Sequence, residues 1–219
     1  KIFERVMQGQ MKTNMEKYLS QYLCGYRKGY NAQYALTAMI EKWKESFDKN
    51  CISGAILMDL SKAFDTLNHE LLIAKLGAYG FDENSLTILL NYLSNSWQRT
   101  KINTCFSNWD ELLTGVPQGS VLGPLLFNIY INDLFFEIEN THVCNFADDT
   151  TLSAFDNKLE NVFYKLENDT KSVIMWFENN FMKLNEDKCH FLISGNIHEY
   201  LFAKVGGEMI WESPEEKLL

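Results

Sequence analysis

Three acidic residues at the ends of apolar, strand-like runs could carry phosphoryl-transfer chemistry. Asp59 follows the run Ile56-Leu57-Met58, and Asp148-Asp149 separates two further strand-like runs. If these strands are neighbours, the carboxylates converge and raise one another's pKa unless a cation neutralises them. Carboxylates plus substrate phosphates are the usual ligands of Mg²⁺, and two such ions clamp the attacking and leaving oxygens of an in-line displacement. A solvated hairpin tip would also explain Asp148-Asp149, so the pair alone does not establish a metal site.

The hydrophobic pattern indicates how these carboxylates must be positioned. Residues 54–59 form an apolar run too short for a typical helix and predict a buried strand that ends at Asp59. Residues 142–147 and 150–155 predict a tight hairpin joined through Asp148-Asp149. If the two predictions hold, the carboxylates lie at strand ends.

The rest of the chain predicts helices packed on an antiparallel sheet. Residues 115–124 contain three glycines and two prolines and predict an irregular loop before a helix from Pro124 to about Ile138. We expect an α+β fold with the sheet backed by helices on one face, as one compact unit. The further predicted elements are helices over 2–23, 32–47, 69–78, 83–97 and 157–180, a polar hairpin over 100–106 and 108–113, and strands over 189–193, 200–205 and 208–211.

Composition limits the class of protein. The chain has 219 residues, 46% hydrophobic composition and a net charge of -9, which exclude intrinsic disorder and argue against a protein that coats nucleic acid electrostatically. The acidic excess lies downstream, because residues 1–50 carry net +4 and residues 51–219 carry net -13. No apolar run is long enough for a membrane span, and the N-terminus lacks a signal peptide. We expect an intracellular protein of the cytoplasm or nucleus, neither secreted nor transmembrane.

The cysteine and histidine residues do not indicate a metal or disulfide framework. Five cysteines, an odd number, occur without a CxxC pair, and the four histidines form no HxxxH or HExxH arrangement. We therefore expect no zinc, and packing roles for these residues.

Several motifs in one order resemble the palm motifs of reverse transcriptases, with the character of non-LTR retrotransposons of the jockey or LINE type. The resemblance covers nearly the whole chain. It is carried by Gly25-Tyr26-Arg27-Lys28-Gly29-Tyr30, Ala55-Ile56-Leu57-Met58-Asp59-Leu60-Ser61-Lys62-Ala63-Phe64-Asp65, Gly115-Val116-Pro117-Gln118-Gly119-Ser120-Val121-Leu122-Gly123-Pro124, Phe146-Ala147-Asp148-Asp149 and Leu184-Asn185-Glu186-Asp187-Lys188.

The resemblance implies a catalytic and metal site. Asp59 and Asp148 would be the principal ligands of two Mg²⁺ ions, or Mn²⁺, with Asp149 as a weaker carboxylate and the Leu60 carbonyl completing one coordination sphere. The ions would activate a primer 3′-hydroxyl and stabilise the leaving pyrophosphate. Phe64 would lie beneath the incoming sugar, where its ring would exclude a 2′-hydroxyl, although a core role also fits it.

The resemblance also implies contacts with nucleotide and nucleic acid. Gln118 and Gly119 would bind the nucleotide and Pro117 the template, in a loop where glycine lets the backbone approach a base pair closely. Lys188 would lie near the triphosphate. Arg27 and Lys28 would contact phosphate in the basic N-terminal part, an expectation from charge and resemblance together.

The resemblance predicts a right-hand polymerase palm with partial fingers, a single reverse transcriptase domain fragment. Residues of about 1–50 and 70–113 would be fingers or the fingers–palm junction, and about 51–69 and 114–219 palm. We expect the N-terminal fingers motifs, thumb, endonuclease and any RNase H region to lie outside the chain. Phe146 and Tyr26 depart from the family's usual Tyr and Phe, but each keeps an aromatic ring.

Three functions remain open from the sequence. The first is an RNA-directed DNA polymerase within a retrotransposon polyprotein, which uses an RNA template, a DNA primer and dNTPs. The second is a non-catalytic palm that binds nucleic acid or a protein. The third, another two-metal palm such as a cyclase or an RNA-templated RNA polymerase, is disfavoured by Phe64, because RNA polymerases commonly place a smaller or polar residue near the sugar. The sequence does not indicate an oligomeric state.

Overall fold

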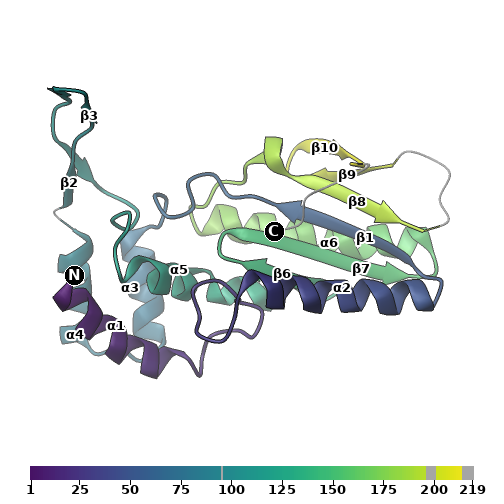
Figure 1. Ribbon diagram of the computed structural model, residues 1–219, viewed down its shortest axis with the longest axis horizontal. Helices are drawn as coiled ribbons and strands as arrows, with labels where there is room; N and C mark the ends of the chain where they lie inside the picture. Colours follow the sequence, from purple (N-terminus) through teal and green to yellow (C-terminus); the bar gives the residue numbers. More distant parts are fainter. Residues whose placement is uncertain (95, 196–200, 214–219) are drawn as a thin grey trace. The chain divides into compact units, whose positions relative to one another are not determined.

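The computed structural model describes residues 1–94, 96–195 and 201–213 (Figure 1). The chain divides into two compact units, one of residues 1–19 and 62–131 and the other of residues 20–61 and 132–219. The three predicted carboxylates belong to the second unit, and the loop over 115–124 belongs to the first. The fingers and palm boundaries drawn from the sequence do not coincide with these units and stay a prediction.

The second unit is built on a four-stranded antiparallel sheet with the strand order β6-β7-β1-β8. In the register of the sheet, Met58 lies opposite Thr150 and Phe146 lies opposite Asp149. The end of β1 is therefore next to the turn that joins β6 to β7. The strands are β1 (Ile52–Met58), β6 (His142–Phe146), β7 (Asp149–Asp156) and β8 (His190–Ser194).

The helix α6 (Leu159–Asn179) covers one face of this sheet. Gly54 allows the close approach, because a Cβ atom there would lie 2.7 Å from Val162 Cγ1 and 2.9 Å from Leu166 Cδ1. Residues on the apolar side of α6, among them Val162, Leu166 and Phe177, are buried. The helix predicted over 157–180 is confirmed apart from its ends.

A second helix, α2 (Ala32–Asp48), contacts the opposite face. Ser46 Oγ lies 2.8 Å from Ser53 Oγ, and Trp43 Nε1 donates to Ser153 Oγ at 3.4 Å. Because successive residues of a strand point to opposite faces, Ser53 and Gly54 face different helices. The expectation of helices on one face alone is wrong, since packing on the second face depends on tertiary contacts that local periodicity does not encode.

A small hairpin completes the second unit. It pairs β9 (Phe202–Val205) with β10 (Glu208–Trp211) and joins the sheet where the Ser213 N–H donates to the Phe191 carbonyl at 2.9 Å. The predicted strands near 189–193, 200–205 and 208–211 are confirmed apart from their ends. Tyr200, the predicted first residue of one strand, lies outside the described residues.

The first unit is mainly helical, with α1 (Ile2–Met15), α3 (His69–Ala78), α4 (Glu83–Leu93) and α5 (Gly123–Ile131). The helix α5 is the core, because Leu126, Phe127, Ile129 and Tyr130 are all fully buried and α1 and α3 pack against it. Side chains of Asn68 and Asp82 accept the Leu71 and Ser85 N–H groups and cap the starts of α3 and α4.

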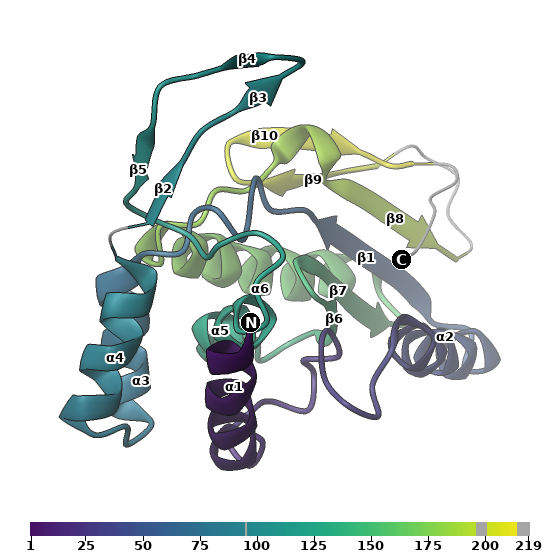
Figure 2. The ribbon, with the colours of Figure 1, turned by 60° about the vertical axis from the view of Figure 1, so that its left-hand side comes forward.

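A two-stranded arm, residues 96–113, differs from the predicted hairpin (Figure 2). The predicted pairing of 100–106 with 108–113 is wrong, because β3 (Lys101–Ile102) pairs with β4 (Cys105–Phe106), whereas β5 (Asp110–Leu112) pairs with β2 (Ser96–Gln98). Residues 96 and 97 belong to the helix predicted over 83–97 but lie in β2. A local helical pattern does not predict the pairing of β2 with β5, which lies more than ten residues downstream.

Other helices also end earlier than their patterns predict. The helix expected over 2–23 ends at Met15, and the helix expected to reach Ile138 ends at Ile131, followed by a 3₁₀ helix, Asn132–Glu137. A tertiary hydrogen bond joins the segments that follow these two helices, because Asn132 Oδ1 accepts the Ser20 N–H at 2.7 Å. Among the described residues, no helix has the length and apolar character that crossing a membrane requires.

Candidate active site

The register of the sheet in the second unit brings the three predicted carboxylates to one edge. Asp59 follows Met58 at the end of β1, and Thr150, the partner of Met58, follows Asp148 and Asp149 in the chain. Asp59 and Asp148 are half-buried, and Asp149 is exposed. The structure therefore places these side chains at neighbouring strand ends, as the sequence predicts.

Asn145 holds the turn that carries Asp148 and Asp149. Its buried side-chain amide donates to the carbonyls of Ala147 and Asp149 and to Thr150 Oγ1, each at 3.1 Å. Ala147 has a φ of 57°, a left-handed conformation typical of primed hairpin turns and costly for a residue with a Cβ atom. Sequence reasoning missed Asn145, whose only local signal is an amide residue just before a predicted turn.

The segment around Gly25 packs directly against the same turn. The Cys24 N–H donates to the Asn145 carbonyl at 3.2 Å, and a Cβ atom on Gly25 would lie 2.4 Å from the Ala147 nitrogen. Glycine is required here because its neighbour is backbone, which cannot move aside. The sequence identified the motif over residues 25–30, but it did not predict the contact of this motif with the acidic turn.

Asp59 is held by the segment that contains Asn185 and Lys188. The Asn185 backbone N–H donates to the Asp59 carbonyl at 2.9 Å, and its side-chain amide donates to Asp59 Oδ2 at 3.0 Å. Lys188 Nζ lies 3.5 Å from the same carboxylate oxygen. The lysine predicted from its motif is therefore beside a candidate metal ligand, whereas the role of Asn185 was missed.

The backbone around Leu60 leaves its carbonyl outside the adjacent ladder. Leu60 and Leu184 form an antiparallel bridge, flanked by a bond from the Ser61 N–H to the Lys183 carbonyl at 2.8 Å and by the bond from Asn185 to Asp59. In such a bridge the bonds come from the residues on either side. The Leu60 carbonyl takes no part in these bonds, and its use as a metal ligand stays a prediction.

Electrostatic repulsion links the three carboxylates. The pKa of the Asp149 carboxyl is raised, first because surrounding protein atoms displace water from it, then because Asp148 and Asp59 are negative, while Lys188 opposes the shift. Loss of water and the negative charge of Asp148 also raise the pKa of Tyr26. Within the described residues, no three His, Cys, Asp or Glu side chains are arranged as a metal-binding group. Mutually repelling, hard oxygen donors fit a divalent cation, which would relieve the repulsion.

Arg27 and Lys28 differ in their surroundings. Arg27 is buried, with its guanidinium donating to the carbonyls of Ser20 and Leu23 and lying 4.5 Å from the Tyr30 ring centroid. Lys28 is exposed. The structure thus gives Arg27 a role in holding its own segment.

The remaining predicted residues lie in the first unit. The Phe64 ring stacks on buried Phe127 with centroids 4.7 Å apart, and the Phe64 carbonyl accepts the Val116 N–H at 3.0 Å. Gln118 Nε2 donates to Asp65 Oδ1 at 3.2 Å. Pro117 is half-buried, and Gly119 is exposed with a φ of 69°. This unit therefore brings Phe64 and the loop over 115–119 together.

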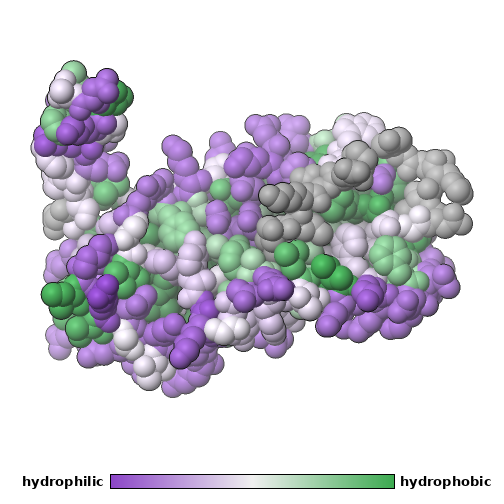
Figure 3. All heavy atoms as spheres, viewed as in Figure 1, coloured by the Kyte–Doolittle hydropathy of each residue, from purple (hydrophilic) through white to green (hydrophobic). Residues whose placement is uncertain are grey.

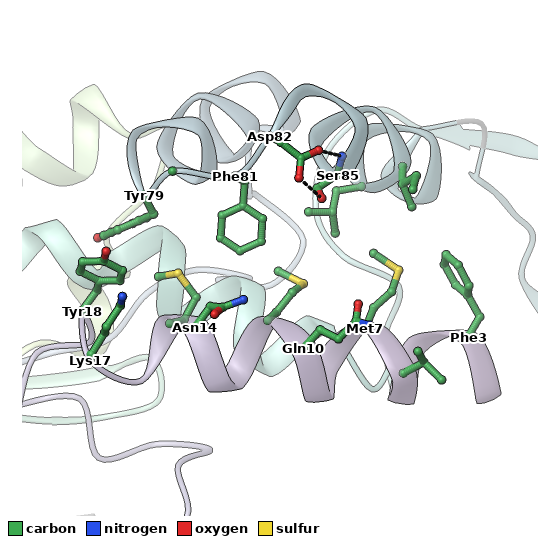
Figure 4. Close-up of a pocket in the computed structure, with 16 residues that line it drawn as sticks. Phe3, Met7, Gln10, Asn14, Lys17, Tyr18, Tyr79, Phe81, Asp82 and Ser85 are labelled. Carbon is green, nitrogen blue, oxygen red and sulfur yellow. Dashed lines mark hydrogen bonds between the residues drawn. The ribbon is translucent and has the colours of Figure 1, made fainter.

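The first unit also contains a groove of about 600 Å³ that none of the predicted site residues lines (Figure 4). It lies between α1 and the start of α4, and its lining includes Met7, Tyr18, Tyr79 and Phe81. The carboxylate within it, Asp82, is engaged as the cap of α4 through the Ser85 N–H and hydroxyl, at 2.9 and 3.1 Å. The groove therefore offers a mixed polar and apolar surface, and its carboxylate is already engaged as a helix cap.

The chain is similar to proteins of retrotransposons. It is 26% identical over 148 residues to the Pol polyprotein of a type-1 R2 retrotransposable element from Popillia japonica, a match that covers 62% of this chain and 23% of that protein. Two Drosophila melanogaster proteins are also 26% identical to it. The one from transposon BS matches 66% of this chain, and the one from mobile element jockey matches 65%. The chain spans 16–23% of the length of these relatives.

Solved structures share the fold. The apo telomerase of Candida tropicalis, truncated from its C-terminal domain, matches 95% of this chain and 43% of that chain with a TM-score of 0.61 and 13% identity. Candida albicans telomerase in complex with a telomeric RNA fragment matches 96% of this chain and 37% of its own, with a TM-score of 0.58 and 13% identity.

A family model described as reverse transcriptase (RNA-dependent DNA polymerase) matches residues 1–211. Its match covers the acidic turn, the Asp59 strand and the Lys188 segment that the second unit assembles at one edge of its sheet. The chain belongs to the reverse transcriptase family.

Proposed function

We propose that this chain is the polymerase part of an RNA-directed DNA polymerase encoded by a retrotransposon. It would add deoxynucleotides to a primer 3′-hydroxyl on an RNA template, in the cytoplasm or nucleus. The observation that carries the proposal is the sheet register, which sets Asp59 beside the Asp148-Asp149 turn. Family membership and the retrotransposon names of the relatives support it.

The acidic edge of the second unit would hold divalent metal ions, which reverse transcriptases generally use. We propose two Mg²⁺ ions bound by Asp59, Asp148 and Asp149 with the Leu60 carbonyl. When bound, such ions lower the pKa of an attacking hydroxyl and stabilise the charge of a leaving phosphate. The pKa of Asp149 is raised first by loss of water and then by the negative charges of Asp148 and Asp59, and this repulsion supports the assignment.

The neighbouring residues of the second unit would position this site. Asn185 orients the Asp59 carboxylate through the side-chain bond at 3.0 Å, and Asn145 maintains the turn that presents Asp148. Lys188, exposed and next to Asp59, would supply positive charge to the pyrophosphate as it leaves. We propose Lys28 as a contact for nucleic-acid phosphate, with Arg27 holding the backbone of the same segment.

The residues of the first unit would act on the nucleotide and template. Gln118 carries both a donor and an acceptor, and its present donation to Asp65 is a single bond at 3.2 Å. We propose Gln118 and Gly119 as nucleotide contacts and Pro117 as a template contact. Phe64, held by its stack on Phe127, would exclude ribonucleotides.

Primer extension tests the proposal in the full-length protein. With an RNA template, a DNA primer, dNTPs and Mg²⁺, Asp148→Asn should lower incorporation by about 100-fold or more, because charge stabilisation at the reacting phosphate is lost. Glu167→Gln, an exposed acidic position on α6, is the matched control and should leave incorporation unchanged. Equal incorporation by Asp148→Asn and the wild type would overturn the site assignment. No incorporation by the wild type, with RNA binding retained, would favour the non-catalytic palm.

A further inference from the structure

The arm of residues 96–113 presents side chains to solvent on both faces. Its strands pair with one another, Trp97 opposite Glu111 and Lys101 opposite Phe106, and within the first unit no helix lies along it (Figure 2). The Ser107 N–H donates to the Thr100 carbonyl at 2.9 Å and continues the pairing between these segments. Such an arm has no second layer that would bury its large side chains.

One face of the arm combines aromatic rings with positive charge. Trp97 and Lys101 lie on this face, opposite Glu111 and Phe106 in the ladder. Arg99 lies between them in the chain and contacts the rings of Phe106 and Trp109. The Arg99 guanidinium lies 4.0 Å from the Phe106 ring centroid and 4.6 Å from that of Trp109. Lys101 Nζ lies 5.3 Å from the Phe106 centroid. These cation–π contacts join Arg99, Lys101, Phe106 and Trp109, and together with Trp97 on the same face they make up the aromatic and basic cluster.

The rings of this cluster are accessible. Trp97, Phe106 and Trp109 expose 56%, 50% and 58% of their surface. In the part of the chain that the structure describes, neither Arg99 nor Lys101 forms an ion pair with an acidic side chain. Figure 3 shows hydrophilic and hydrophobic residues side by side over the arm. The face therefore offers open ring surface and two cations that form no ion pair, with one carboxylate, Glu111, opposite Trp97.

The opposite face of the arm lacks this combination. It carries Gln98, Thr100 and Ile102 on one strand, with Cys105 and Asp110 across from Ile102 and Gln98. Ile102 is 68% exposed, so this face is also apolar at its tip, but it has no aromatic ring and no cation. The two faces therefore allow a binding experiment with an internal control.

We propose that the aromatic and basic face of the arm binds single-stranded RNA. Nucleic-acid bases stack on aromatic rings with little regard to sequence, and Arg and Lys neutralise the phosphates between them. Trp97, Phe106 and Trp109 would receive bases, while Arg99 and Lys101 would contact phosphate. The inference rests on the proposed function only in its choice of RNA as the partner, since the arm contains none of the proposed metal ligands.

Fluorescence anisotropy of a labelled, unstructured RNA of about 12 nucleotides tests the proposal with the full-length protein. Trp109→Ala and Phe106→Ala should each weaken binding by about tenfold, and Trp109→Phe should restore most of the affinity because it keeps a ring. Lys101→Gln should make the slope of log affinity against log salt less steep by about 0.7 between roughly 50 and 200 mM salt. Far-UV circular dichroism should be unchanged, because all these side chains are exposed.

Ile102→Ala provides the matched control on the opposite face and should bind RNA as the wild type does. The proposal is overturned if Trp109→Ala binds with wild-type affinity, if Ile102→Ala loses as much affinity, or if the wild-type protein does not bind the RNA. A change of sedimentation coefficient in Trp109→Ala without a change in RNA affinity would mark the face as a protein interface instead. Asp148→Asn should still bind RNA, so failure of the arm and failure of the active-site assignment give different results.

Discussion

Asn185 binds both the backbone and the side chain of Asp59. Its backbone N–H donates to the Asp59 carbonyl at 2.9 Å, and its side-chain amide donates to Asp59 Oδ2 at 3.0 Å. The carboxylate at the end of β1 is therefore oriented by a residue 126 positions downstream. Lys188, one helical turn further on, lies 3.5 Å from the same oxygen. The motif that contains Asn185 and Lys188 is thus a support for Asp59.

Replacing Asn185 by Ala should impair catalysis more than stability. Loss of the amide leaves Asp59 Oδ2 without this donor, and residues that orient metal ligands typically affect metal affinity or activity by about 10- to 100-fold. Primer extension at several Mn²⁺ concentrations should show a lower rate and a higher metal midpoint, with the urea midpoint nearly unchanged. Asn168→Ala, at an exposed position on α6, is the control. Equal rates for the two variants would contradict the orienting role.

Gly25→Ala should destabilise the acidic turn. The new Cβ atom would meet the Ala147 nitrogen at 2.4 Å and its Cα at 2.8 Å, and overpacking of this kind costs about 1–3 kcal/mol. Urea denaturation followed by circular dichroism measures the loss. Gly207→Ala, with no atom within 4 Å of the added Cβ, should stay close to the wild type. If both variants unfold at the same urea concentration, the close packing of Gly25 on Ala147 is not present in solution.

Phe64→Ala should reduce discrimination against ribonucleotides. If the ring excludes the 2′-hydroxyl by steric clash, its removal should raise the relative kcat/KM for a ribonucleotide by about tenfold or more. Phe64→Tyr, which keeps the ring, should remain selective. Because Phe64 stacks on Phe127, the thermal midpoint of each variant should be measured beside the kinetics. Unchanged selectivity in a folded Phe64→Ala protein would assign this ring to packing alone.

The ion pair between Asp156 and Lys165 should make the free energy of unfolding depend on pH in the acid range. Hydrogen bonds from Lys165 and Asn161 lower the pKa of Asp156 to about 2, below its value in an unfolded chain. The contribution of this carboxylate is therefore present above about pH 4 and is lost as the pH falls towards 2. Both side chains are partly exposed, so solvent screening limits the contribution to about 1 kcal/mol.

Urea titrations of Asp156→Asn and the wild type at several pH values measure this contribution. The free energies of unfolding should differ by about 1 kcal/mol near pH 6 and should converge as the pH falls below 4. A difference that is constant over this range, or that grows in acid, would show that the charge of Asp156 is not the source of the stabilisation.

Local sequence patterns predicted the strands and helices that the site needs. The apolar run before Asp59 forms β1, and the hairpin around Asp148-Asp149 forms with nearly the expected bounds. Helix α3 matches its predicted range, His69–Ala78, because Asn68 caps its start. These elements depend on periodicity, caps and turns, which act within a few residues of the chain.

The sequence by itself determined the acidic residues, the strand ends that carry them and the family motifs, since these are properties of residue type and spacing. Only the tertiary structure revealed that Asn145 and Gly25 hold the turn, that Asn185 orients Asp59, and that the arm joins residues 96–98 to 110–112. These contacts join residues brought together by strand register and side-chain packing. Their energies depend on neighbours distant in the chain, which no local pattern of hydrophobicity encodes.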